Sequence, residues 1–171
     1  GTMAFGTNST AYFTNTITAD VSVNNSLLQT DIGNLVFAPQ TNNWSLTNNV
    51  LNLAVGAGAP TITVATNTAT IGSRLDGAQG LAKTGAGTLR LSGTNTFQGG
   101  FTLEAGTVVV ASDSALSGGV KTLAGGTIAL SRFIGERGVW SRRAGARSGC
   151  RQATHSEYAR YSTTRPRPGT R

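Results

Sequence analysis

The sequence predicts an all-β fold, a right-handed parallel β-helix (β-solenoid) over residues 1–131 that is followed by a disordered tail over residues 132–171. Two observations predict it. Strand-like segments recur about every 20 residues, and each alternates apolar and polar side chains, as a strand with one buried face does. The charge is also divided unevenly, because the body and the tail differ in composition.

The clearest repeat has the form glycine, threonine, apolar, any residue, apolar. Its copies are Gly87–Leu91, Gly106–Val110 and Gly126–Leu130, and their glycines are 19 and 20 residues apart. A second short strand precedes each copy: Leu81–Lys83, Phe101–Leu103 and Lys121–Leu123. Two strands and two turns at a fixed period are typical of a solenoid rung that stacks in parallel on the preceding rung.

A weaker form of the same rhythm continues upstream. We expect Trp44–Leu46 and Leu51–Leu53 to form one rung, and Thr61–Val64 and Ala69–Ile71 to form the next. No window shows helical spacing of its apolar residues. About six rungs are expected in all, each adding ~4.8 Å to the rod.

The alternation also predicts which side chains face the interior. The inward set is Leu89, Leu91, Val108, Val110, Ile128 and Leu130, and the outward set is Thr88, Arg90, Thr107, Val109, Thr127 and Ala129. Lys83 falls in an inward column with Leu103 and Leu123. We expect the stem of Lys83 to lie along this column while its ammonium group reaches water.

Charge separates the chain near Ser131. Residues 1–131 carry a net charge of −1, whereas residues 132–171 carry +8 from ten arginines and two glutamates. The only cysteine, Cys150, and the only histidine, His155, lie in the tail. The body therefore offers neither a thiol nucleophile nor an imidazole ligand.

The arginine-rich tail has two interpretations. Arginines interleaved with Trp140, Tyr158 and Tyr161 are a pattern that can bind phosphate backbones. The alternation stops after Ser131, however, and no other period replaces it. We expect residues 132–171 to be a disordered or non-native segment, such as the product of a frame shift, rather than a nucleic-acid-binding element.

The body contains no recognisable catalytic, cofactor-binding or metal-binding set, so we predict no such site residues and no cofactor. Its carboxylates are scattered, without the paired spacing of an acid–base pair or a calcium site: Asp20, Asp31, Asp76, Glu104 and Asp113. Neither Gly99-Gly100 nor Gly85-Ala86-Gly87 continues as a calcium or phosphate loop would. Trp44, Phe97 and Phe101 are expected in the core rather than on a sugar-stacking surface.

One segment carries a specific resemblance. Residues 80–100 read GLAKTGAGTLRLSGTNTFQGG. This run resembles the autotransporter-associated β-strand repeat, also called the passenger-associated transport repeat, whose pattern is G-L-x-K-x-G-x-G-T-L-x-L-S-G-x-N-T-Y-x-G-G. Phe97 stands for the usual tyrosine, and further along Phe101 and Val108 replace threonine and leucine. The match covers about residues 76–111.

The resemblance implies a structural segment of a type V secreted passenger at the bacterial cell surface. Such a segment supports export across the outer membrane and acts as a rigid stalk, and it is not an enzyme. The implied partner is a C-terminal outer-membrane β-barrel translocator, with a host surface or polysaccharide as a further partner. We expect the sequence to begin inside a longer protein. An adhesin or carbohydrate-binding solenoid is the alternative, and a polysaccharide-degrading enzyme ranks below it.

Overall fold

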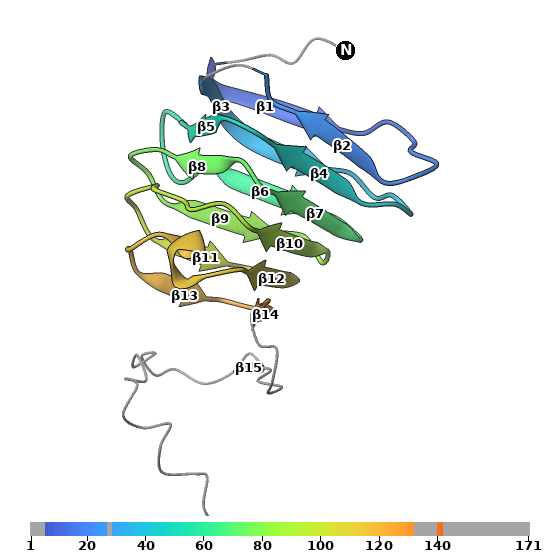
Figure 1. Ribbon diagram of the computed structural model, residues 1–171. Coiled ribbons are helices and arrows are strands. Elements are labelled where there is room, and N and C mark those ends of the chain that lie inside the picture. Colours follow the sequence, from blue (N-terminus) through green and yellow to red (C-terminus); the bar gives the residue numbers. More distant parts are fainter. Residues whose placement is uncertain (1–5, 27–28, 132–139, 142–171) are drawn as a thin grey trace, which may run out of the picture.

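Short strands stack in parallel, each on a strand of the preceding turn of the chain. The fold comes from a computed structural model that describes residues 6–26, 29–131 and 140–141. The chain winds as a β-solenoid of six turns, which we number rungs 1 to 6 from the N-terminus (Figure 1). Within the described ranges the one helical element is a short 3₁₀ turn, η1 (Asp113–Leu116). The structure thus confirms the all-β parallel solenoid predicted from the repeat.

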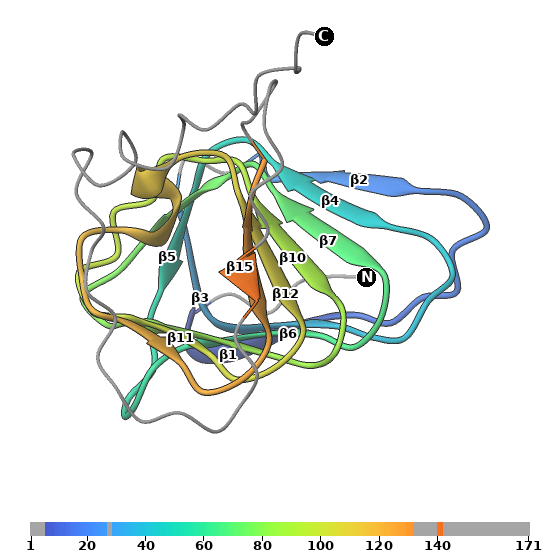
Figure 2. The ribbon, with the colours of Figure 1, turned by 90° about the horizontal axis from the view of Figure 1, so that it is seen from below.

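Viewed along its axis, the solenoid has three faces (Figure 2). Face 1 contains β1 (Gly6–Phe13), the second half of β3 (Gln29–Phe37), β6 (Thr61–Val64), β9 (Leu81–Thr84), β11 (Phe101–Leu103) and β13 (Lys121–Leu123). Face 2 contains β2 (Val21–Asn24), β4 (Trp44–Thr47), β7 (Thr68–Ile71), β10 (Thr88–Leu91), β12 (Thr107–Val110) and β14 (Thr127–Leu130). Face 3 contains the first half of β3, β5 (Val50–Leu53) and β8 (Arg74–Asp76). We count each rung from face 3 through face 1 to face 2, so that β8, β9 and β10 form rung 4.

Face 3 is the part of the architecture that the sequence did not predict. The segment Leu51–Leu53 pairs with β3 and β8 on this face, so it is not the second strand of a two-strand rung that begins at Trp44. Trp44 instead lies beside Ala69, 25 residues further along the chain. The expected pairing of these upstream strands is therefore wrong, because the early rungs are longer than the repeat from which the period was taken.

In rungs 5 and 6, face 3 continues without regular strands. The backbone N–H of Thr96 donates to Leu75 O at 2.8 Å, and that of Gln98 donates to Gly77 O at 2.9 Å. The turn η1 follows in rung 6. The repeats that are clearest in the sequence thus contain only two strands each, and a two-strand period was the natural prediction from them.

The interior columns follow the predicted alternation until the last rung. Leu89, Leu91 and Val108 are completely buried and Val110 is nearly so. Their partners in rung 6 differ, because Ile128 is only half-buried and Leu130 is 42% exposed. Leu130 keeps its place in the inward column, in register with Val110, and is exposed because among the described residues no strand of a seventh rung lies over it.

The turns between faces allow the rungs to stack closely because they contain glycine. Gly106, between β11 and β12, has a φ of +76°, which favours glycine over residues with a side chain. A Cβ atom placed there would clash with the carbonyl oxygens of Gly85 and Gly87 in the rung below. At the other end of face 1, a Cβ on Gly100 would lie 2.6 Å from Val120 O. These glycines let backbone stack directly on backbone at the corners.

The two neighbouring valines of β12 test this architecture. Val110→Asp places a carboxylate in a closed apolar column, so we expect it to lower the free energy of unfolding by at least about 3 kcal/mol. Val109→Asp, whose side chain points outward, should cost no more than about 1 kcal/mol. Urea unfolding followed by circular dichroism measures both. Equal losses in the two variants would contradict the assignment of faces.

Candidate functional site

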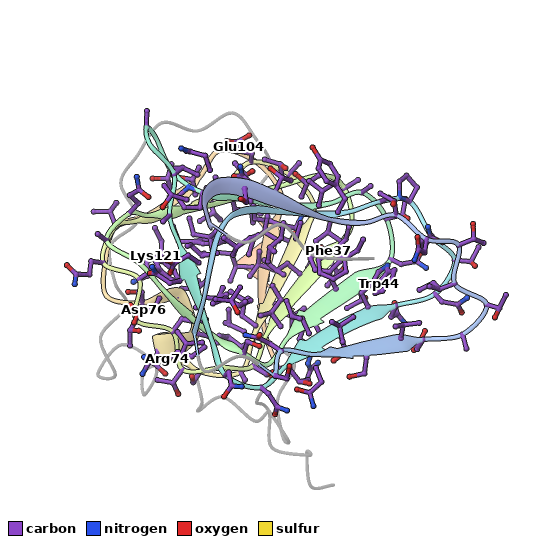
Figure 3. All side chains as sticks on the ribbon, turned by 90° about the horizontal axis from the view of Figure 1, so that it is seen from above. Phe37, Trp44, Arg74, Asp76, Glu104 and Lys121 are labelled. Atoms are coloured by element: carbon purple, nitrogen blue, oxygen red, sulfur yellow. The ribbon has the colours of Figure 1, made fainter. Side chains whose placement is uncertain are left out.

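The acidic side chains of the body that the structure describes form no cluster of three or more. Asp31 accepts a hydrogen bond from Asn52 Nδ2 at 2.8 Å, and Asp76 pairs with Arg74 at 3.4 Å. Figure 3 shows Asp76 and Glu104 on different sides of the solenoid. Asp113 opens η1 in rung 6. Asp31 and Asp76 are therefore each occupied by a neighbouring side chain.

Asp20 lies beside a shallow groove on the outside of face 2. Asn43 donates to both carboxylate oxygens of Asp20, from its backbone N–H at 2.8 Å and its side-chain amide at 3.2 Å. These bonds lower the pKa of Asp20 below its usual value. The groove has a volume of about 330 Å³, and its polar lining is Asp20, Ser22, Asn43, Ser45, Thr68 and Thr70. It offers hydroxyl and amide groups but no evident nucleophile.

The aromatic residues form core contacts instead of an exposed platform. Phe97 and Phe101 are completely buried, and Trp44 is 8% exposed. Phe13 stacks on Phe37 with ring centroids 4.5 Å apart and meets Trp44 edge-on at 5.3 Å. The expected core role of Trp44, Phe97 and Phe101 agrees with this packing. Trp44 Nε1 is buried without a hydrogen-bond partner among the described residues.

The described residues contain neither a metal-binding cluster nor a membrane-spanning helix. No group of three histidine, cysteine or acidic residues there is close enough together to hold a metal ion. No helix in the same ranges has the length and apolar character needed to cross a bilayer. Cys150, His155 and the tail arginines lie outside the described residues. Of the tail the structure describes only β15 (Trp140–Ser141), which pairs antiparallel with β14.

The most unusual interior group is Lys83, which has no exposed surface at all. Its ammonium Nζ donates to Thr84 O at 2.6 Å, Gly85 O at 2.7 Å and Ala105 O at 3.2 Å. Burial lowers the pKa of Lys83 to about 8. The sequence placed Lys83 correctly in an interior column, but the expectation that its ammonium group reaches water is wrong. The inward-facing carbonyls hold the group inside.

A second buried polar residue, Asn95, links three consecutive rungs. Its Oδ1 accepts from the backbone N–H of Leu75 in rung 4 at 2.8 Å, and its Nδ2 donates to Ala115 O in rung 6 at 2.6 Å. Its own N–H donates to Ser114 O at 3.2 Å. Sequence reasoning did not single out Asn95, although the asparagine two residues before Phe97 is part of the repeat pattern.

The polar contacts that Lys83 and Asn95 make between rungs are the candidate functional site, because both side chains are buried and both bond to a neighbouring rung. Lys83, Asn95 and the corner glycine Gly106 lie within or beside β9 to β12. The same stretch matches a family model described as the passenger-associated-transport-repeat, over residues 81–110. The match lies inside the range, about 76–111, in which the resemblance was read from the sequence.

A known autotransporter protein is similar in sequence to half of this chain. The chain is 42% identical over 85 residues to the adhesin BmaC autotransporter of Brucella suis biovar 1. The alignment takes in 50% of this chain and 2% of the adhesin, so the chain spans a very small part of that relative's length. No solved structure matches the chain significantly. Both comparisons thus support the resemblance to an autotransporter passenger that contains the associated repeat.

Asn95 gives a direct test of the polar junctions. Asn95→Ala leaves the Leu75 N–H and the Ala115 carbonyl without partners, so we expect the free energy of unfolding to fall by at least about 2 kcal/mol. Asn95→Asp keeps the acceptor for Leu75 but loses the donor to Ala115. Asn52→Ala, which removes a surface amide, should change stability by about 0.5 kcal/mol or less. Chemical denaturation that shows Asn95→Ala to be no worse than Asn52→Ala would contradict this role.

Proposed function

We propose that this segment supports export of its passenger across the outer membrane by folding rung upon rung, and that it then serves as a rigid stalk at the cell surface. The observation that carries the proposal is the unbroken parallel stacking of β6, β9, β11 and β13, with the passenger-associated-transport-repeat at its centre. Each rung is a template for the next, because every strand offers one edge to the strand that follows.

The folding of one rung releases enough free energy to bias movement of a chain. Rung 4 buries four leucines completely or nearly so: Leu75, Leu81, Leu89 and Leu91. Burial of each contributes roughly 1.5–3 kcal/mol before the loss of chain entropy is subtracted. A rung that has folded outside the membrane must therefore unfold before the chain can slide back, and this cost makes the movement directional.

The remaining parts of the proposal follow from the passenger character of the chain. The partner is a C-terminal outer-membrane β-barrel translocator, and the location is the cell surface or the medium. The segment acts mechanically and not as an enzyme. We further propose that residues 1–131 form the folding unit and that residues 132–171 are separate from it.

An export assay tests the proposal. The chain is fused to an outer-membrane translocator, and the protein accessible to external protease is compared with the total protein. Val109→Pro removes a backbone donor from β12 and should reduce the displayed fraction several-fold, with undisplayed chain retained in the periplasm. Val109→Thr keeps a β-branched residue at the same outward position and should be displayed normally. Undiminished display of Val109→Pro would show that export does not depend on rung folding.

Adhesion is a second candidate function, favoured by the aligned relative, which is named an adhesin. The groove on face 2 is the surface that fits it best, since its hydroxyl and amide groups can bond to sugar hydroxyls. Asp20 borders this groove.

A glycan array probed with the full chain tests the adhesin function. Binding that is lost in Thr70→Glu, which alters the lining of the groove, and kept in Thr102→Glu, which lies on face 1, would support adhesion at this surface. Absence of binding by the unmodified chain to any glycan would count against it.

A further inference from the structure

Lys83 has no counterpart in the rungs on either side. It lies between Ile62 in rung 3 and Leu103 in rung 5, and Leu123 continues the column in rung 6. An apolar side chain at this position would therefore be sufficient to fill the column. Burying an ammonium group there costs free energy, so its presence needs a specific compensating interaction.

The compensation comes from two turns that meet at the corner between faces 1 and 2. Gly85, with a φ of +77°, shapes the turn after β9, and this turn presents the Thr84 and Gly85 carbonyls to Nζ. The third carbonyl, of Ala105, belongs to the equivalent turn of rung 5. An ammonium group has three N–H donors, and Lys83 directs them at these three acceptors. Two bonds therefore hold the lysine in its own rung, and one reaches the next rung.

We propose that Lys83 is a rung-locking residue, which joins the turns of rungs 4 and 5 so that the two rungs open as one cooperative unit. If rung 5 separates from rung 4, the ammonium group loses the Ala105 carbonyl and that carbonyl loses its donor. Bonds to a charged donor are about twice as strong as neutral ones, so the coupling exceeds that of one ladder bond. An apolar residue in the same column would hold the rungs together only by contact.

The surroundings of Lys83 are consistent with this role. The two strands that flank β9, which are β6 and β11, carry no titratable side chain. No carboxylate is therefore bonded to the ammonium group, and the backbone carbonyls are its partners. Asn95 links rungs 4, 5 and 6 at a separate position on face 3, so the repeat is fastened at two corners.

Locking has a consequence for export that rests on the proposed function. A cooperative unit of two rungs resists backsliding with the folding free energy of both, whereas an independent rung resists only with its own. The experiment below measures the locking without any export step. A negative result there would leave the export proposal standing, and a negative export assay would leave the locking standing.

Chemical replacement of the ammonium group tests the proposal. Lys83→Cys is made in the full chain with Cys150→Ser, unfolded, and alkylated either with 2-bromoethylamine or with 1-bromopropane before refolding. The first reagent restores a side chain with a terminal ammonium group, and the second gives an apolar side chain of nearly the same length. Amide hydrogen exchange is then followed by mass spectrometry in peptides that cover β9 and β11 to β12. Leu103→Met, in the same column, is the control for altered packing.

We expect the aminoethyl form to behave like the unmodified chain, with β9 and β12 amides exchanging through a common opening. In the propyl form the β11 and β12 amides should exchange about 10-fold to 100-fold faster, as the loss of a charge-assisted hydrogen bond implies, while β6 and β7 remain protected. If only the aminoethyl form refolds and the propyl form does not, that result would also support the lock. Identical exchange in the two forms would overturn it.

If neither form refolds, Lys83→Arg and Lys83→Met, expressed directly, provide the same contrast, because arginine keeps the donors and methionine does not. Faster exchange of β11 and β12 in Lys83→Met than in Lys83→Arg would support the lock. Equal exchange in these two variants would overturn it.

Discussion

The structure depends on one constraint, which is that successive rungs stack in parallel with their backbones in contact at the glycine-containing corners. A Cβ atom at Gly106 or Gly100 would clash with carbonyl oxygens of a neighbouring rung. Once the corners are in contact, the strands between them fall into register and their inward side chains form continuous columns. The hydrophobic core is thus a consequence of the corner geometry as much as its cause.

A solenoid built in this way has a narrow interior, in which a buried polar group costs free energy unless it finds a partner within the rod. Lys83 and Asn95 show how the chain meets this demand. Both donate to backbone carbonyls of turns, and both reach a neighbouring rung. Buried polar groups of this kind add little net stability, but they are satisfied only in the correct arrangement of rungs. They therefore contribute specificity to a stack whose apolar columns are alike.

The same architecture accounts for where the acidic and aromatic side chains of the described residues lie. Its carboxylates serve surface hydrogen bonds, as Asp31 does with Asn52, and its aromatic side chains pack inside. What the chain accumulates along its length is folding free energy, one rung at a time. The proposed export role uses that property directly, and the proposed lock at Lys83 enlarges the step.

The sequence by itself determined the parallel solenoid, the columns from Leu89 to Val110 and the interior position of Lys83, because a period near 20 residues and strict alternation leave one stacking arrangement. Only the tertiary structure decided the third face, where β5 and β8 pair across rungs of unequal length. It also decided the partners of Lys83 and Asn95, and the exposure of Leu130. These depend on which backbone groups point inward at a turn and on which rung lies above, and neither is encoded in the local pattern of apolar residues.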